Sequence, residues 1–179
     1  MDSKQRELDK IAFEIEHCDE CKRGKVGQAV PGEGNPDADI LFVGEAPGRN
    51  ESATGRPFIG RSGKLLRENI RRIGLKEEDV YITSPVKYLP EYKTPKPSDI
   101  EHGLIHFKKQ VAIINPRIIV PMGRVACLAV LGRDVQVSKE HGKLEEGKYF
   151  IMYHPSAAIR FKKFKIVFEH DFDLLKQIL

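Results

Sequence analysis

Short apolar runs separated by longer amphipathic segments constrain the fold of this chain more than any other feature. The runs occupy residues 39–43, 80–83, 117–122 and 149–153. Each is short and rich in β-branched or aromatic residues, which is typical of buried strands. Around them, apolar residues recur at helical spacing. The predicted helices cover residues 4–17, 62–73, 98–114, 124–131 and 164–179.

Strands that alternate with helices predict βαβ units, whose parallel strands are covered by helices on both faces. We therefore expect an α/β fold, a three-layer α/β/α sandwich with a central, largely parallel four-stranded sheet. The segment 135–146 is expected to hold a hairpin or an irregular strand. A chain of 179 residues has the length of one domain, so we expect a single domain over residues 1–179.

The composition narrows the class of protein. Hydrophobic residues make up 40% and charged residues 31%, with 30 basic against 26 acidic side chains, which excludes a disordered tail of one charge sign. No apolar stretch approaches the roughly 18 residues of a membrane helix, and the first residues lack the apolar core of a signal peptide. We expect an intracellular protein without a membrane partner. Three cysteines, an odd number, argue against a disulfide framework.

Residues suited to binding and chemistry follow the predicted strands. They are the turn GEAPG at 44–48, Ser84, Gly123 and His154. In parallel α/β sheets ligands bind at the carboxyl ends of the strands, so we expect the site there. Alone, the glycine-rich turn indicates only an ordinary strand-to-loop turn, and a single histidine is more often structural. At a strand end, however, an imidazole can donate a hydrogen bond to a developing anion.

The segment GRPFIGRSG at 55–63 is a rigid loop with an aromatic residue at its centre. Phe58 either packs in the core or offers a stacking platform to a planar ligand. Its glycine, arginine and proline neighbours favour the platform.

A basic cluster lies near the C-terminus. It consists of Arg160, Lys162, Lys163 and Lys165, interleaved with Phe161 and Phe164. Such a run is either the solvated face of an amphipathic segment or a contact for phosphates. The net charge of +4 permits a nucleic-acid partner without requiring one.

Together these segments resemble the uracil-DNA glycosylase superfamily, and most closely its family 4, the iron–sulfur-containing type of bacteria and archaea. The resemblance implies a cytoplasmic, prokaryotic-type DNA-repair enzyme, expected to be a monomer, that flips a deaminated base out of DNA and hydrolyses its N-glycosidic bond. The matching segments, in chain order, are GEAPG at 44–48 with Glu51, GRPFIGRSGKLL at 55–66, VYIT at 80–83, NPRIIVPMG at 115–123 and HPSAAIR at 154–160.

The resemblance also implies roles in a base pocket. His154 and Glu45 are the expected catalytic residues, with His154 donating to uracil O2 as negative charge builds on the leaving base. Backbone groups of Gly44 and Glu45 are expected to contact the edge of the base, and Phe58 to stack on it. Ala46 stands where relatives with the strongest activity have a catalytic aspartate. No lysine occupies a motif position suited to a Schiff base, so we expect a monofunctional enzyme without lyase activity.

A DNA-contacting segment is implied after the histidine. The loop 157–160 is expected to wedge into the gap that the flipped base leaves, and the basic side chains are expected to face phosphates. The expected DNA-binding residues are Ser156, Ala157, Ala158, Ile159, Arg160, Lys162 and Lys163.

The cysteines depart from the family pattern. Cys18 and Cys21 match the first pair of cluster ligands, but Tyr88 and Gly103 stand at the third and fourth positions. Cys127 lies far from the matching motif and is expected to be a small buried hydrophobe. Because an iron–sulfur cluster normally takes four thiolates, we expect no complete 4Fe–4S cluster and no other cofactor.

A residual metal site at the two matching cysteines stays open, with His17 or His102 recruited as a further ligand. Without a cluster, the loop 87–97 must be held by packing. Tyr88 and Tyr92 are the candidates for that packing.

A second departure is Ser84, where family members usually have an asparagine that reads the N3 and O4 edge of uracil. A serine hydroxyl is shorter and rotates, so weaker discrimination or a different deaminated base is expected. The two departures keep an alternative function open, a lesion-binding DNA protein with weak or lost glycosylase activity.

Overall fold

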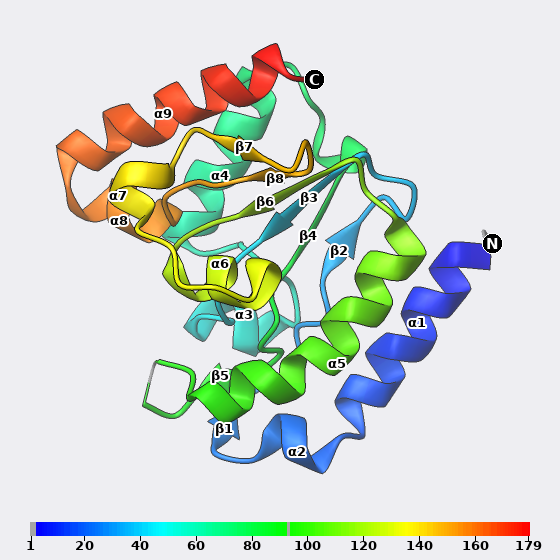
Figure 1. The fold of residues 1–179 in the computed structure, drawn as a ribbon. Coiled ribbons are helices and arrows are strands. Elements are labelled where there is room, and N and C mark those ends of the chain that lie inside the picture. The colour runs from blue at the N-terminus through cyan, green and yellow to red at the C-terminus, as the bar shows by residue number, and fades with distance from the viewer. Residues whose placement is uncertain (1–2, 93) are drawn as a thin grey trace.

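The central sheet has six strands in the order β2-β4-β3-β6-β8-β7. The computed structural model describes residues 3–92 and 94–179 of the chain (Figure 1). The strands of the sheet are β2 (Glu33–Gly34), β3 (Ile40–Val43), β4 (Val80–Thr83), β6 (Ile118–Pro121), β7 (Leu144–Glu145) and β8 (Tyr149–Phe150).

The four inner strands are parallel, as the apolar runs predict. β3 pairs with β4 on one side and β6 on the other, and β6 continues to β8 through the pair Ile119–Tyr149. An isolated parallel bridge between Met122 and Met152 extends this last pairing. The outer strands β2 and β7 are antiparallel to their neighbours. They widen the expected four-stranded sheet to six strands. β7 falls in the segment 135–146 that was predicted as a hairpin or irregular strand, whereas β2 was not predicted because two residues are too few for a hydrophobic pattern.

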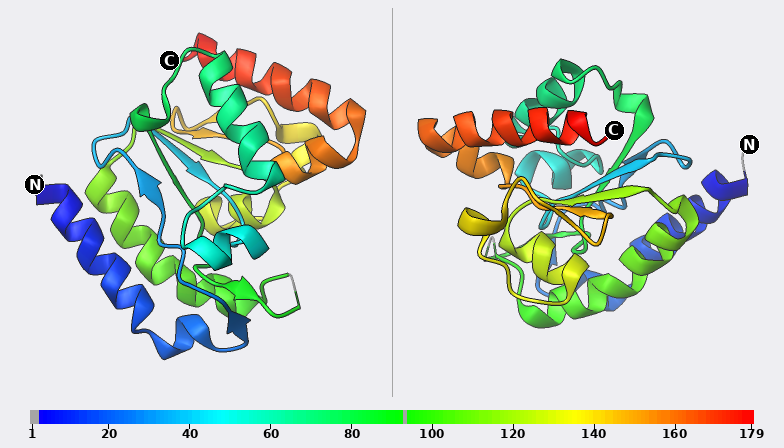
Figure 2. Two further views of the ribbon diagram at one scale, coloured as in Figure 1. Left: turned by 180° about the vertical axis from the view of Figure 1, so that it is seen from behind. Right: turned by 45° about the horizontal axis from the view of Figure 1, so that its top comes forward.

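Helices cover both faces of the sheet because successive side chains of a strand point to opposite sides. In β3, Phe42 packs in a core with α4, α8 and α9, whereas Leu41 packs in a second core with α1, α5 and α6. The right-hand view of Figure 2 shows the sheet between these two helical layers. The predicted α/β/α sandwich is therefore confirmed.

The long predicted helices are present, with ends shifted by a few residues. Segment 135–146, predicted as a hairpin or irregular strand, begins instead with the short helix α7 and then enters β7, which does form a hairpin with β8. The α-helices are α1 (Ser3–Glu16), α2 (Asp19–Lys22), α3 (Arg49–Thr54), α4 (Arg61–Arg72), α5 (Pro97–Ile114), α6 (Arg124–Leu131), α7 (Val137–Glu140), α8 (Pro155–Arg160) and α9 (Lys162–Gln177), and a 3-10 helix covers Glu77–Asp79.

The N-terminal part packs across α5. α1 lies beside α5, and α2 leads into β1 (Lys25–Val26), which pairs antiparallel with β5 (Leu89–Pro90) (Figure 1). The fully buried Lys87 ties this region to the sheet, because its Nζ donates to Pro31 O, Thr83 Oγ1 and Gln110 Oε1 at 3.0, 2.7 and 2.7 Å. Three acceptors match the three donors of an ammonium group.

The loop 87–97 is held by one of its two candidate tyrosines. Tyr88 is buried and its hydroxyl donates to Ile15 O at 3.3 Å, as expected for a packing residue. Tyr92 is 79% exposed, so its predicted packing role is wrong. Lys93, in the same loop, lies outside the described residues. Among the helices that the structure describes, none has the length and apolarity needed to cross a membrane.

Phe172 offers a direct test of the core beneath α9. It is fully buried and its ring centroid lies 5.9 Å from that of Phe42. Phe172→Ala should lower the free energy of unfolding by about 3–5 kcal/mol, because it removes buried surface and leaves a cavity. Urea unfolding measures the change. The matched control is Phe13→Ala, whose ring is 62% exposed and which should change stability by less than about 1 kcal/mol. Equal losses in both variants would contradict this assignment of the core.

Candidate active site

A pocket of about 420 Å³ lies where the inner strands end. Because these strands are parallel, the residues that follow them meet at one edge of the sheet. Ala46, Phe58, Ser84 and His154 all line this pocket, so the structure brings together predicted residues that are distant in sequence. The volume is within the range of small-molecule sites.

Phe58 forms one wall of the pocket in a strained backbone conformation, with φ of 51°. Its ring lies directly against Gly44, where a Cβ atom would come within 2.5 Å of the ring. Its carbonyl lies against Gly63, where a Cβ atom would come within 1.8 Å of the oxygen. Two glycines thus make room for the aromatic wall, which is half-buried, packs against the main core and also lines the pocket.

Glu51 and Arg67 hold the loop that carries Phe58. The Glu51 carboxylate accepts hydrogen bonds from the amides of Ile59 and Gly60 at 2.9 and 2.8 Å. From the other side, Arg67 donates to Phe58 O at 3.0 Å and pairs with Glu33 at 2.6 Å. The phenyl ring is therefore fixed before any ligand arrives.

His154 faces Phe58 across the pocket, with the two ring centroids 5.9 Å apart. Its Nδ1 accepts a hydrogen bond from the backbone amide of Ser156 at 3.2 Å and lies 2.7 Å from the Ser156 hydroxyl. Burial lowers the pKa of His154 to about 4, so the imidazole is neutral near pH 7. Because Nδ1 accepts, the proton of the neutral ring sits on Nε2, which is left to donate.

Ser84 is buried and donates its hydroxyl proton to Val86 O at 2.9 Å. With its hydrogen engaged there, the hydroxyl oxygen can only accept a hydrogen bond from a ligand. Ala46 presents a methyl group to the same pocket. Toward a ligand, Ser84 thus offers an acceptor and His154 offers a donor.

Gly44 and Glu45 stand apart from the other predicted base-contacting residues. Gly44 is buried behind Phe58. The side chain of Glu45 lines a neighbouring groove with Gly123 and Ser156, and burial raises its pKa. Neither residue lines the pocket itself, whereas Ala46 and Pro47 of the same turn do.

The predicted DNA-contacting loop after His154 is a helix, α8, capped by the His154 side chain. Ser156, Ile159 and Arg160 line a shallow depression beside the pocket, together with Arg61. Ala157 is partly exposed on the same helix, but Ala158 is buried in the core under α8. The expectation that the Ala158 side chain contacts DNA is therefore corrected, because this helix turns one face inward.

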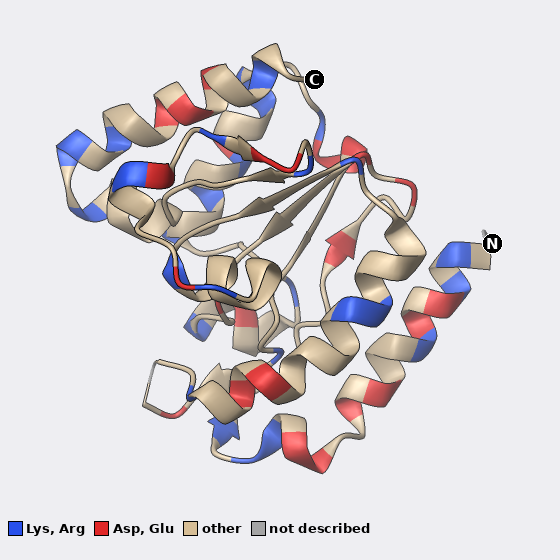
Figure 3. Ribbon diagram, viewed as in Figure 1, with Lys and Arg blue, Asp and Glu red and all other residues tan. Residues whose placement is uncertain are grey.

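Exposed cations gather where α8 meets α9. Arg160, Lys162 and Lys163 have no carboxylate partner within the described residues, whereas Lys165 pairs with Glu169 at 3.7 Å. Figure 3 shows the basic side of this junction. Arg49 and Arg61 add further positive charge at the pocket itself. Sequence reasoning missed these two arginines, although Arg61 lies within the motif at 55–66 and Arg49 directly follows the motif at 44–48.

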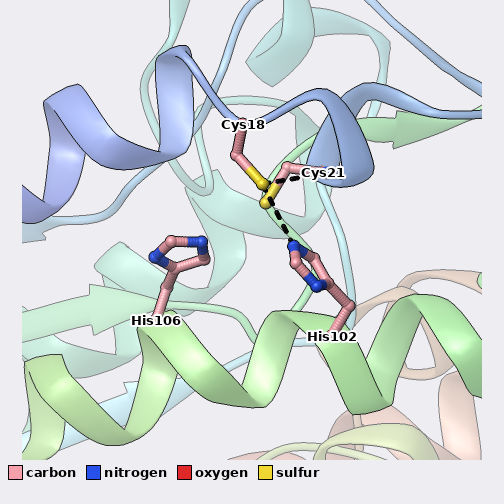
Figure 4. A group of neighbouring side chains, drawn as sticks. All are labelled: Cys18, Cys21, His102 and His106. Atoms are coloured by element: carbon pink, nitrogen blue, oxygen red, sulfur yellow. Dashed lines mark hydrogen bonds between the residues drawn. The ribbon is translucent and has the colours of Figure 1, made fainter.

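The two matching cysteines lie in a cluster with two histidines. The ligand atoms of Cys18, Cys21, His102 and His106 all lie within 4.8 Å of one another (Figure 4). His17 lies outside this group, because its ring stacks on Phe13. Sequence reasoning left His102 open as a ligand and missed His106, although two histidines four residues apart on a predicted helix share one face.

The group does not fit a four-thiolate iron–sulfur cluster. Cys127 is buried on α6 with Val135 and Ile151, as expected for a small hydrophobe. At Gly103, the implied fourth position, a Cβ atom would come within 2.3 Å of Pro85 O. A cysteine could therefore not stand there without moving the backbone of residues 85–86.

Comparisons with known proteins show the family. The model of the uracil DNA glycosylase superfamily matches residues 31–176. The type-4 uracil-DNA glycosylase of Sulfurisphaera tokodaii is 37% identical, over 96% of this chain and 84% of that relative. That of Archaeoglobus fulgidus is also 37% identical, over 96% of this chain and 92% of the relative. That of Thermotoga maritima is 44% identical, over 73% of this chain and 71% of the relative.

Glu51→Ala should release the loop that carries Phe58. Hydrogen exchange at the amides of Ile59 and Gly60 should accelerate by about 10–100-fold, because each loses a charge-assisted hydrogen bond of about 1.5–3 kcal/mol. Exchange followed by NMR measures the change residue by residue. Glu68→Ala, an exposed glutamate on α4, is the control and should leave both amides unchanged. Unaltered exchange in Glu51→Ala would show that the carboxylate does not anchor the loop.

Proposed function

The chain belongs to the uracil-DNA glycosylase superfamily, and from this premise we propose that it excises uracil from DNA by base flipping and hydrolysis of the N-glycosidic bond. The observation that carries the proposal is the pocket between Phe58 and His154, with an aromatic wall on one side and a neutral imidazole donor on the other. A glycosidic bond cannot be reached inside a duplex, so the base must leave the stack and enter such a pocket.

The rate acceleration is assigned to charge stabilisation. Cleavage of the bond leaves an oxocarbenium-like sugar and a uracil anion, and water then adds to the sugar carbon. His154 Nε2 donates a hydrogen bond to uracil O2 as the negative charge develops there. The neutral ring already carries the required proton on Nε2. The edge of the base is assigned to the backbone of the turn 44–48, of which Ala46 and Pro47 line the pocket. Ala46 supplies no carboxylate, so the donor carries most of the chemistry.

We also propose that the enzyme is monofunctional and acts as a monomer of one domain. Among the described residues, no lysine lines the pocket, which supports hydrolysis without a Schiff base.

His154→Ala should lower uracil excision by about 100–1000-fold, equivalent to about 2.7–4 kcal/mol of transition-state stabilisation. Single-turnover cleavage of a uracil-containing oligonucleotide, with abasic sites opened by alkali, measures the rate. His170→Ala, an exposed histidine on α9, is the control and should retain full activity. Retained DNA binding without cleavage by the wild-type protein would instead favour a lesion-binding protein.

The low pKa of His154 gives a pH prediction. Its pKa is about 4 in the folded chain against 6.5 for a free histidine, so the wild-type rate should show no inflection from this group between about pH 5 and 8. Between pH 4 and 6.5 the unfolded chain binds more protons at His154 than the folded chain does. The contribution of His154 to the free energy of unfolding therefore falls as the pH is lowered through that window. A wild-type rate that falls with a pKa near 6.5, absent in His154→Gln, would contradict a neutral donor.

Ser84 sets the choice of base in this proposal. Uracil carries an N3–H donor where cytosine carries an acceptor, and the hydroxyl oxygen, whose hydrogen is held by Val86 O, suits only the donor. The same oxygen would accept from the ring N–H of hypoxanthine or xanthine. Discrimination against cytosine is therefore retained, and discrimination among deaminated bases is relaxed.

Ser84→Asn should raise uracil excision by about 10-fold, because an amide adds a donor for O4 and so one further hydrogen bond of about 1–1.5 kcal/mol. Oligonucleotides carrying uracil, hypoxanthine or xanthine are compared at single turnover. Ser62→Asn, at another serine of the pocket wall, is the matched control and should not raise the rate. An unchanged or lower uracil rate in Ser84→Asn would refute the idea that this position limits activity.

The junction of α8 and α9 is assigned to phosphate binding, with Ser156, Ala157 and Ile159 beside the flipped base. Lys162→Ala should weaken binding about equally for all sequences and reduce the slope of log K against log salt by about one. Fluorescence anisotropy with the inactive His154→Ala background gives both quantities. Lys176→Ala, exposed at the far end of the same helix, should leave the slope unchanged. Equal slopes for the two lysine variants would exclude this surface.

A further inference from the structure

A group of four nitrogen and sulfur donors joins the N-terminal helices to α5, away from the pocket. Cys18 precedes α2 and Cys21 lies within it, whereas His102 and His106 are one turn apart on α5. Figure 4 shows the two imidazole rings rising from the same face of α5 toward the two sulfur atoms. We propose that these four residues bind one Zn²⁺ ion in place of an iron–sulfur cluster.

The spacing suits a single ion. With metal–sulfur bonds of about 2.3 Å and metal–nitrogen bonds of about 2.0–2.1 Å, the ligand atoms of a tetrahedral zinc site lie about 3.3–3.8 Å apart. Here Cys18 Sγ and His102 Nε2 are 3.2 Å apart, and all four ligand atoms lie within 4.8 Å of one another. Small side-chain adjustments therefore complete a tetrahedron, and two thiolates with two imidazoles are a common ligand set of structural zinc.

Neighbouring groups lie where the hydrogen-bond partners of metal ligands are usually found. The Cys21 amide donates to Cys18 Sγ at 3.4 Å, which stabilises a thiolate. His106 Nδ1 is buried without a hydrogen bond among the described residues, and the Glu14 carboxylate lies 3.7 Å from it. A metal-bound histidine usually turns its second nitrogen toward a carboxylate, so a small shift of Glu14 supplies this partner.

The surroundings explain why an iron–sulfur cluster is replaced. Tyr88 packs against Cys21 in the apolar cluster with Ile11 and Ile15, and so fills the place of a third thiolate. A two-iron cluster can also take two cysteines and two histidines, but it binds the two pairs to different irons. The short distance between Cys18 Sγ and His102 Nε2 places one ligand of each kind on the same ion.

The site is closed, since four protein ligands leave no position for water or substrate, which marks a structural metal. It fastens the segment between α1 and α2 to α5, and α5 follows the loop that carries Tyr88. The metal would thus stabilise the N-terminal layer without entering the chemistry at His154.

Metal analysis of the purified full chain tests the proposal. Elemental analysis should find one zinc and no iron per chain. After the zinc is removed, Co²⁺ should restore folding stability and give the visible absorption of tetrahedral cobalt bound by thiolate. Cys21→Ser and His106→Ala should each weaken zinc binding by more than about 100-fold, beyond the loss typical of an outer partner. His17→Ala, a neighbouring histidine that stacks on Phe13, is the control and should bind zinc as the wild type does.

His106→Cys keeps the site testable if the other variants fail to fold. It retains four ligands, so it should bind Co²⁺ with a stronger thiolate-to-cobalt charge-transfer band than the wild type. Iron with acid-labile sulfide in the wild-type protein would overturn the proposal. So would a wild-type chain that binds neither Zn²⁺ nor Co²⁺, or an equal loss of zinc in His17→Ala. None of these readouts depends on glycosylase activity.

Discussion

Parallel pairing of β3 with both β4 and β6 is the constraint on which the rest of the structure depends. A strand buried on both faces needs a helical layer on each side, and α4 with α9 and α5 with α1 provide them. Because the strands run the same way, the segments beginning at Gly44, Ser84 and His154 emerge at one edge. The pocket is a consequence of this pairing, since no two of these segments are neighbours in sequence.

Preorganisation of the pocket depends on the unfavourable backbone conformation of Phe58. Phe58 has a positive φ, which a bulky residue adopts only when its surroundings enforce it. The Glu51 carboxylate and the Arg67 guanidinium enforce it through four hydrogen bonds to the 57–60 backbone. An aromatic wall fixed in this way does not have to be ordered when a base enters, so binding is less opposed by lost conformational freedom.

Charge is divided between the interior of the pocket and its rim. Inside, His154 is neutral and Ser84 is an acceptor, which suits a neutral base that gains negative charge only as the bond breaks. Outside, Arg160 and Lys162 are exposed without carboxylate partners among the described residues, which suits phosphates. The N-terminal layer forms a third region, where the ligand atoms of two cysteines and two histidines lie within 4.8 Å of one another.

The sequence by itself determined the order of the four inner strands and of the longer helices, and it predicted the edge of the sheet where the pocket lies. Apolar periodicity is local, so it is readable without contacts, whereas two-residue edge strands such as β2 carry too little of it. Only the tertiary structure decided that Ala158 turns inward and that Glu51 anchors Phe58. It also decided that Cys18 meets His102, 84 residues away. Such contacts depend on how whole helices pack, and side-chain packing over those distances leaves no periodic signal in the chain.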